Sequence, residues 1–575
     1  MKNLVFFILI ALSCLNRLCA QTNTKEITPI QFCSDRIAPL HEVRAVWLTT
    51  IGGLDWPHSY ANTPTSIEKQ KKEFCSILDK LQNAGINLIF LQTRVRATTI
   101  FPCDTEPWDG CLSGVPGKSP GYDALSFAVE ECHRRGMQIH AWVVTIPVGK
   151  WNGAGCRNLR KTAPNLLKKI GDEGFMNPEN AATSDYLASF CSDIARRYDI
   201  DGIHLDYIRY PENWGKIKNK DAGRKNITHI VESINKAVKK EKGWIMMSCS
   251  PIGKYADLPR QWSHGWNARD IVCQDAAEWM KNGLMDALFP MMYFKGNNFY
   301  PFAIDWQERS AGRIVAPGLG IYFLSPKEKN WALEDITREL EVLRLYGMGH
   351  TYFRSKFFTD NTKGIYDYVA DNYCTYPALI PAMTWYHFKS PEPPSIIEYS
   401  PVSATSIRLK WKEGKDNSDG SYLTYNIYAS TSYPVNCQDA KNIIATYKRG
   451  TCITVPKGWF YAVTAVDRYG NESEPRQMFS DNNSKDIEPK EPANSPTCPM
   501  LICSTTLRLN QLNHTFPISP KTSLIGIESL KGNIIKTFMP TEDIDLTDIP
   551  NGMYVVRSIH KKGITHRLCF LKVKK

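Results

Sequence analysis

The sequence predicts an α/β protein, a (β/α)8 TIM barrel followed by two small all-β sandwich domains. The main observation is a regular alternation of β-like runs and helical patterns from Glu42 to about Arg354, as expected of parallel βαβ units. Eight such units over roughly 310 residues fit a TIM barrel. A doubly wound sheet is the alternative, but the turn after Thr50 lacks the phosphate-binding GxGxxG pattern.

The predicted strands and helices alternate in chain order. The strands are residues 42–50, 87–95, 138–145, 202–210, 245–253, 286–294, 314–323 and 348–354. The helices are residues 66–84, 124–135, 184–198, 224–241, 274–282 and 328–346. We assign the barrel to residues 21–376.

Proline content and short alternating strands divide the rest of the chain. Residues 377–394 are proline-rich and read as a linker, and residues 395–478 contain short strands separated by turn residues, which is typical of a β-sandwich. Residues 479–499 read as a second linker, and residues 500–575 are again rich in β-like runs.

The amino-terminal segment predicts export. Lys2 precedes an apolar run from Leu4 to Leu12 that is too short to span a bilayer, and small residues follow, so residues 1–20 read as a secretory signal. We therefore expect a periplasmic, cell-surface or secreted protein without a membrane span. A lipoprotein signal at Cys14 is a less favoured alternative.

Charge and cysteine content exclude some classes of protein. The formal charge is +12, but no Lys/Arg block is dense enough to predict nucleic-acid binding. Of 17 cysteines, 15 remain after cleavage behind Ala20, and the nearby pairs 103/111, 437/452 and 498/503 are candidates for disulfides. No CxxC…CxxC or HExxH pattern is present, so we expect no metal and no cofactor.

Polar side chains at the predicted strand ends indicate an active site. In a TIM barrel the carboxyl ends of the strands form the site, and alternation places His204 and Asp206 on one face of the fourth strand. Arg94 and His140 occupy similar positions in the second and third strands. Buried charges are costly unless they are paired, so such a cluster indicates a functional pocket, with a structural ion-pair network as the alternative.

Two carboxyl groups at this face would suit glycoside hydrolysis, where one protonates the leaving oxygen and the other attacks carbon or activates water. Asp206 is the first candidate and Asp275 the second, although Asp275 also suits a helix N-cap. Asp55, Asp305 and Glu308 are further possible partners. Aromatic rings stack on sugars, and six tryptophans lie near strand ends: Trp47, Trp56, Trp108, Trp151, Trp262 and Trp266.

Residues 42–360 carry motifs in an order that resembles the glycosyl-hydrolase-like 10 family of bacterial barrels. These include EVRAVWLTTIGGLDWP, INLIFLQTRVRATTIFP, YDIDGIHLDYIRYP, SPIG, QDAAEWMKNGLMDALFPMMYF and GLGIY. The resemblance implies hydrolysis of glycan strands, either peptide-free peptidoglycan or dietary or host polysaccharide, with Asp206 as the catalytic carboxylate. The residues that it implies near the pocket are Arg94, His140, His204, Tyr207, Arg209, Asp275 and Tyr293.

The chain departs from this family at two motifs. Members often have Asp-Asp where this chain has Leu205-Asp206, and WINP where it has residues 142–145. The segment 395–478 resembles fibronectin type III modules, and residues 500–575 resemble the C-terminal sorting domains of type IX secretion. The oligomeric state is open.

Two other functions fit the same residues. A non-catalytic glycan-binding protein could use the same barrel scaffold, since a fold does not imply activity. A metal-dependent hydrolase could use Asp206, His204 and His140 as ligands, because His-x-Asp in one strand places two ligands on one face.

Overall fold

The computed structural model describes residues 38–479 except 262, 264, 419 and 421, together with seven strands between residues 500 and 573. The chain divides into two compact units, residues 1–484 and residues 485–575. The signal at residues 1–20 and most of the linker at 479–499 lie outside the described residues.

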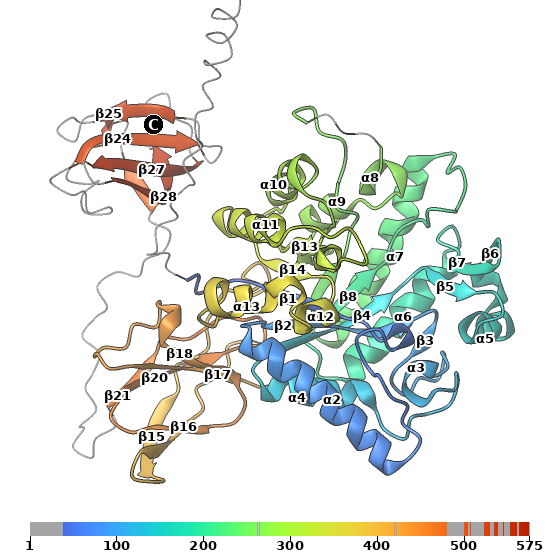
Figure 1. Cartoon of the computed structure of the whole chain (residues 1–575), viewed down its shortest axis with the longest axis horizontal. Coiled ribbons are helices and arrows are strands. Elements are labelled where there is room, and N and C mark those ends of the chain that lie inside the picture. The colour runs from blue at the N-terminus through green and yellow to red at the C-terminus, as the bar shows by residue number, and fades with distance from the viewer. Residues whose placement is uncertain are drawn as a thin grey trace, which may run out of the picture. The chain divides into compact units, whose positions relative to one another are not determined.

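The first unit is built on a parallel sheet of strands from Glu42 to Arg354, a TIM-barrel-like α/β fold (Figure 1). Its strands are β1 (Arg44–Leu48), β2 (Leu88–Val95), β4 (Gln138–Val144), β8 (Gly202–Asp206), β9 (Met246–Cys249), β10 (Ala287–Leu288), β11 (Met291–Met292), β12 (Ile314–Val315), β13 (Gly318–Leu319) and β14 (His350–Tyr352). The parallel ladder runs β1-β2-β4-β8-β9-β10-β12 on one side, and β14, which pairs with β1, continues it on the other side through β13 to β11.

Two predicted strands are each split by a proline. β10 and β11 lie on either side of Phe289 and Pro290, and β12 and β13 lie on either side of Ala316 and Pro317. Proline has no N–H to donate to a sheet, so the regular ladder stops at these positions. Because β11 pairs with β13, and β13 with β14, the interrupted pieces still continue the ring of parallel strands back to β1.

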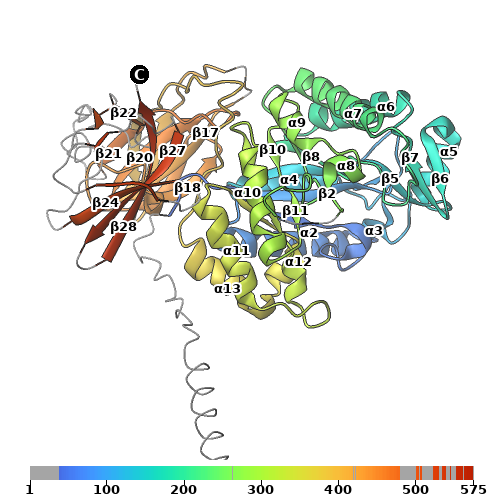
Figure 2. The ribbon, with the colours of Figure 1, turned by 90° about the horizontal axis from the view of Figure 1, so that it is seen from above.

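Helices lie outside the strands (Figure 2). They include α2 (Pro64–Asn83), α4 (Ala124–Arg134), α6 (Ala182–Arg197), α7 (Lys220–Glu241), α9 (Ala276–Lys281), α10 (Tyr300–Glu308) and α11 (Leu333–Leu345). Helix α2 begins with a capping box between Thr63 and Ser66, and it buries Phe74, Leu78 and Leu81. The sequence patterns did not predict α10.

The long segment after β4 forms a small structure of its own. It holds α5 (Ala154–Thr162) and an antiparallel sheet of β5 (Pro147–Lys150), β6 (Leu167–Ile170) and β7 (Glu173–Met176). The shorter elements α3 (Gly110–Ser113), α8 (Ala268–Ile271), α12 (Ser355–Thr359), α13 (Ile365–Tyr368) and β3 (Thr98–Thr99) complete this part of the unit, with one-turn helices between them.

Residues 395–479 form two antiparallel sheets. One has the order β15-β16-β19, with β15 (Ser395–Pro401), β16 (Ser406–Lys412) and β19 (Cys452–Pro456). The other has the order β18-β17-β20-β21, with β18 (Ile443–Lys448), β17 (Thr424–Ser430), β20 (Phe460–Val466) and β21 (Arg476–Phe479). Trp411 and Tyr425, from different sheets, share one buried core, with ring centroids 5.1 Å apart.

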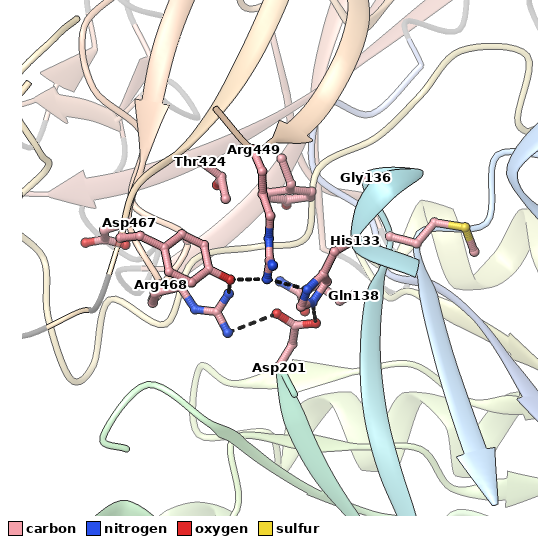
Figure 3. A pocket seen from close by; sticks show the side chains of 12 residues that line it. His133, Gly136, Gln138, Asp201, Thr424, Arg449, Asp467 and Arg468 are labelled. Carbon is pink, nitrogen blue, oxygen red and sulfur yellow. Dashed lines mark hydrogen bonds and ion pairs between the residues drawn. The ribbon is translucent and has the colours of Figure 1, made fainter. Parts of the chain in front are cut away.

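These sheets contact the barrel where β4 and β8 begin (Figure 3). Arg468 lies 3.3 Å from Asp201, and Tyr422 donates a hydrogen bond to Asp199. Arg449 contacts His133, which in turn lies 2.8 Å from Asp201. The preceding proline-rich segment is also packed, since Leu379 and Ile380 are buried and Trp385 donates to Asp286.

The second unit has two sheets. The first has the order β22-β28-β27-β24-β25, with β22 (Met500–Cys503), β28 (Gly563–Val573), β27 (Gly552–His560), β24 (Thr522–Ser529) and β25 (Ile534–Phe538). The second pairs β23 (Thr506–Leu507) with β26 (Ile544–Asp545).

Two of the three candidate disulfides lie within the described residues, and neither is formed. Cys103, Cys111, Cys437 and Cys452 are all free thiols. Cys103 lies 3.4 Å from the Thr105 hydroxyl, and Cys437 points to the Val435 carbonyl. Cys498 of the third pair lies outside the described residues. No helix in the described part of the chain has an apolar stretch that would reach across a membrane.

Candidate active site at the carboxyl ends of the strands

Asp206 is the last residue of β8, at the carboxyl end of the strand. The strand ends four residues earlier than the sequence predicts because Tyr207 has a positive φ of 51°, in the left-handed region. Such a conformation is costly for a residue with a side chain, and strain of this kind clusters at active sites. The turn leaves Asp206 6% exposed at the end of the parallel strands.

Three donors hold the Asp206 carboxyl group. Oδ1 accepts from the Tyr207 N–H at 2.8 Å and from the Ser250 hydroxyl at 2.9 Å. Oδ2 accepts from the Trp142 indole N–H at 3.1 Å. A carboxylate oxygen has two lone pairs, so Oδ2 keeps one for a further partner.

Burial raises the pKa of Asp206, and it outweighs the hydrogen bonds from Ser250 and Trp142 and the positive charge of Arg209, which all lower the pKa. Asp206 therefore holds its proton to higher pH than an exposed aspartate. This property suits a general acid, and the free lone pair of Oδ2 marks where a proton or a reacting atom would meet the group.

Tyr207, Arg209 and Tyr293 lie around Asp206. The Arg209 guanidinium stacks 4.4 Å from the centre of the Tyr207 ring and lies 2.6 Å from Glu212. Burial and the charge of Asp206 raise the pKa values of both Tyr207 and Tyr293. Four predicted site residues, Asp206 included, thus share one neighbourhood.

The two predicted histidines lie inside the barrel rather than at its mouth. His204 and His140 are 0% exposed. His204 accepts from the Trp47 indole N–H at 3.2 Å and contacts the Ser248 hydroxyl at 3.0 Å, which also lies 3.4 Å from His140. Burial lowers the pKa of His140 to about 4 and that of His204 well below its ordinary value, so both are neutral.

This placement also bears on the hypothesis of a metal-dependent hydrolase. Both ring nitrogens of His204 already have partners, and Asp206 bonds to other groups, so the three proposed ligands do not converge. Among the described residues, the set that could hold a metal ion is Glu42, His350 and Cys374. Arg44 and Arg344 each lie 2.7 Å from Glu42, and their positive charges disfavour a cation there.

Arg94 is fully buried and pairs with Glu106 at 2.7 Å. Its guanidinium also donates to the Thr145 carbonyl, and Thr145 in turn donates to the carbonyl of Asp206. Arg94 therefore supports the backbone beside Asp206 and does not contact the carboxyl group itself. A buried pair of this kind is costly to break from one side.

Asp275 does not accompany Asp206. Its carboxylate accepts from the Tyr255 hydroxyl at 2.5 Å and lies 3.8 Å from Arg224 on α7. Asp275 is the N-cap residue of α9, but its side chain makes no cap hydrogen bond. Asp305 and Glu308 pair with Arg309 and Arg260. Each of these three carboxylates thus has partners of its own.

Asp55 and Trp56 are structural in this conformation. Asp55 accepts from the Thr49 N–H and hydroxyl, both at 2.8 Å, and contacts Arg354 after β14. Trp56 is 0% exposed and donates to the Gln70 carbonyl on α2. Trp47 is also buried, while Trp266 is 40% exposed.

Sequence patterns missed three features of the site. Ser250 and Trp142 hold Asp206, and Glu106 neutralises Arg94. The first two had a signal, since Ser250 begins the SPIG motif and Trp142 shares a strand face with His140. Glu106 lies in a loop, where no periodicity could place it.

Comparisons with known proteins show similarity to glycosyl hydrolases. Residues 42–223 match the family described as Glycosyl hydrolase-like 10. That segment runs from β1 through β8 and includes Asp206. The chain is 26% identical to the glycosyl hydrolase YngK of Bacillus subtilis over 480 residues, 75% of this chain and 92% of that protein.

A second relative is the glycosyl hydrolase DigH of Escherichia coli, with 27% identity over 291 residues, 44% of this chain and 65% of that protein. Solved structures that match in part include an α-L-fucosidase from Paenibacillus thiaminolyticus, with 15% identity, a TM-score of 0.38 and coverage of 57% of this chain and 49% of that chain. Another is the endo-fucoidan hydrolase MfFcnA4, with 10% identity, a TM-score of 0.39 and coverage of 93% and 83%.

Proposed function

We propose that this protein is an exported glycoside hydrolase that cleaves a polysaccharide at the carboxyl ends of the barrel strands. Asp206 is the carboxyl group that carries the reaction, as acid/base or nucleophile. The observation that carries the proposal is the Asp206 site itself, where a buried carboxyl group with a raised pKa keeps one oxygen lone pair open beside a strained Tyr207.

The substrate class follows from the relatives and the resemblance of the motifs. Two relatives carry the name glycosyl hydrolase. Peptide-free peptidoglycan strands are the first substrate to test, and dietary or host polysaccharides are the second. The proposal also includes the signal at residues 1–20, a fibronectin type III-like role for residues 395–478 and a sorting role for residues 500–575.

A reducing-end assay tests the activity. The mature protein and Asp206→Asn are incubated with peptide-free peptidoglycan strands and with soluble plant and host glycans. We expect new reducing ends from one substrate, and a loss of about 10³-fold or more in rate in the variant. Near-normal turnover by a folded Asp206→Asn protein would remove Asp206 from the mechanism.

A glycan-binding protein without activity is the second candidate. It is favoured by one observation: the predicted second carboxylate, Asp275, is held by Tyr255 and Arg224, whereas most glycosidases use two carboxyl groups at the site. This reading predicts retention on glycan gels with no product from any substrate.

A further inference from the structure

Four half-buried aromatic side chains follow one another from strand to strand beside Asp206. Tyr293 follows β11, Tyr322 lies in the one-turn helix Ile321–Leu324 after β13, and Phe353 follows β14. Phe357 is in α12, four residues further on. The carboxyl ends of parallel strands meet at one face of a barrel, so these rings share a face with Asp206. We call the four the aromatic row.

The rings of the row are in contact. The centroid of Tyr293 lies 5.7 Å from that of Tyr322 and 5.3 Å from that of Phe353. Tyr322 lies 5.8 Å from Phe353 and 6.3 Å from Phe357. These separations are typical of packed aromatic pairs, so the row is one continuous apolar surface.

The row rests on a buried layer, and its four residues are only partly buried. Beneath it, Trp47 is 1% exposed and packs edge-on against Phe353 at 6.0 Å. By contrast, all four residues of the row are partly exposed. Gly320 permits this arrangement, because a Cβ atom there would lie only 3.1 Å from the Cβ of Tyr293.

The row and Asp206 lie at the same end of the barrel. Asp206 ends β8 and Tyr293 directly follows β11, and the charge of Asp206 contributes to raising the pKa of the Tyr293 hydroxyl. An occupant of the row would therefore reach Asp206 at the Tyr293 end. Aromatic surfaces with few polar groups are typical of sites that bind small molecules and chains, and the apolar C–H faces of sugar rings fit such surfaces.

We propose that the aromatic row is the binding platform for the glycan, which runs from Asp206 across Tyr293, Tyr322 and Phe353 toward Phe357. This inference rests on the proposed function and adds the side of the site on which the glycan lies. It assigns substrate contacts to tyrosine and phenylalanine rings after the sixth to eighth strands, rather than to the tryptophans.

The test separates binding from cleavage. All variants carry Asp206→Asn in the full chain, so that bound glycan is not consumed. Retardation is measured in gels that contain peptide-free peptidoglycan strands, xylan or hyaluronan. Tyr322→Ala and Phe357→Ala are each expected to weaken binding about three- to tenfold, the range for one aromatic contact.

Tyr386→Ala is the matched control. This tyrosine is 40% exposed, and its hydroxyl donates to Gly283, which precedes the sixth strand and so lies toward the opposite end of the barrel. The protein with Asp206→Asn and Tyr386→Ala should bind glycan as tightly as the protein with Asp206→Asn alone. Circular dichroism and melting temperature show that each variant is folded, and Tyr322→Phe, which keeps the ring, should restore binding.

The outcomes distinguish this inference from the proposed function. Parent-like binding by folded Tyr322→Ala and Phe357→Ala proteins would overturn the platform, even if the wild type cleaves glycan. Weaker binding by Tyr322→Ala and Phe357→Ala, together with no cleavage by the wild type, would support the platform and overturn the proposed hydrolase activity. Lack of retention by all three glycans would overturn the platform as well.

Discussion

Buried carboxyl groups at the two ends of the barrel have pKa values shifted in opposite directions. At the carboxyl ends of the strands, Asp206 has three neutral donors and a raised pKa. At the amino ends, Glu42 lies between Arg44 and Arg344, and Asp201 lies between His133 and Arg468. There burial alone would raise the pKa values of Glu42 and Asp201, but these partners lower both.

The difference indicates that one end of the barrel stabilises the fold and the other is suited to catalysis. A carboxylate with compensating charges stays ionised and holds elements together, as Glu42 joins β1 to α11. A carboxyl group that is buried with only neutral donors is poised for proton transfer at a cost in stability. The same division is general in TIM barrels, where one face carries chemistry and the other carries stability.

The largest expected effect is at the carboxyl ends of the strands, where Asp206 lies. Asp206→Asn should lose about 10³-fold or more in rate on a cleaved glycan. Its melting temperature at pH 7 should match or exceed that of the wild type, because the change removes a buried group whose ionisation burial disfavours. Calorimetry beside the rate assay measures both, and a clearly lower melting temperature would contradict this account of Asp206.

Glu42→Ala tests the opposite end. Removal of this carboxylate leaves Arg44 buried without its charge partner, which typically costs about 3–5 kcal/mol in unfolding free energy. The rate of glycan cleavage per folded molecule of Glu42→Ala should stay within about twofold of the wild-type rate.

Urea unfolding measures the loss in Glu42→Ala. Its control is Lys281→Ala, which removes one partner of the exposed pair with Glu278 and should cost less than about 0.5 kcal/mol. Similar losses in both variants would show that burial does not distinguish these ion pairs.

A third prediction concerns Arg468, which joins the sheets of residues 395–479 to the barrel. Arg468→Ala removes a buried partner of Asp199 and Asp201, and we expect a loss of about 1–3 kcal/mol. In Arg468→Ala, residues 38–479 should still unfold in one transition, and tryptophan fluorescence and circular dichroism should both report it. Separate transitions in the wild type would show that the sheets and the barrel fold independently.

The pH dependence should have opposite signs at the two ends. The pKa of Asp201 is lowered on folding, so its stabilising contribution is complete above the ordinary value of 3.8 and is lost as pH falls below it. The pKa of Asp206 is raised, so its cost appears as pH rises through 3.8 toward the folded value.

Unfolding free energies from pH 3 to 7 measure these contributions. Relative to wild type, Asp201→Asn should become less stable and Asp206→Asn more stable as pH rises. Slopes of the same sign in the two variants would refute the comparison between the ends.

The smallest expected effect is at Trp142. Trp142→Phe removes one hydrogen bond to Asp206, which should raise its pKa further and cost about 1 kcal/mol. The limb of the pH–rate profile that reports Asp206 should move to higher pH with only a modest loss of maximal rate. An unchanged profile would mean that the indole N–H does not tune the carboxyl group.

The sequence by itself determined the alternation of strands and helices and the position of Asp206. Periodicity identifies these because neighbouring residues in the chain impose it, and motif order carried the likeness to the glycosyl-hydrolase-like 10 family. Alternation also placed His140 and His204 on one face with Asp206, but only depth in the barrel separates a neutral core histidine from one at the mouth.

Tertiary structure alone decided the partners. Glu106 pairs with Arg94 from a loop, and Arg224 with Asp275 and Arg468 with Asp201 join residues far apart in the chain, so no local pattern records these contacts. It also ended the fourth strand at Asp206, where Tyr207 takes a left-handed conformation. Charge compensation and burial act through space, so the chemistry of Asp206 follows from its surroundings rather than from its motif.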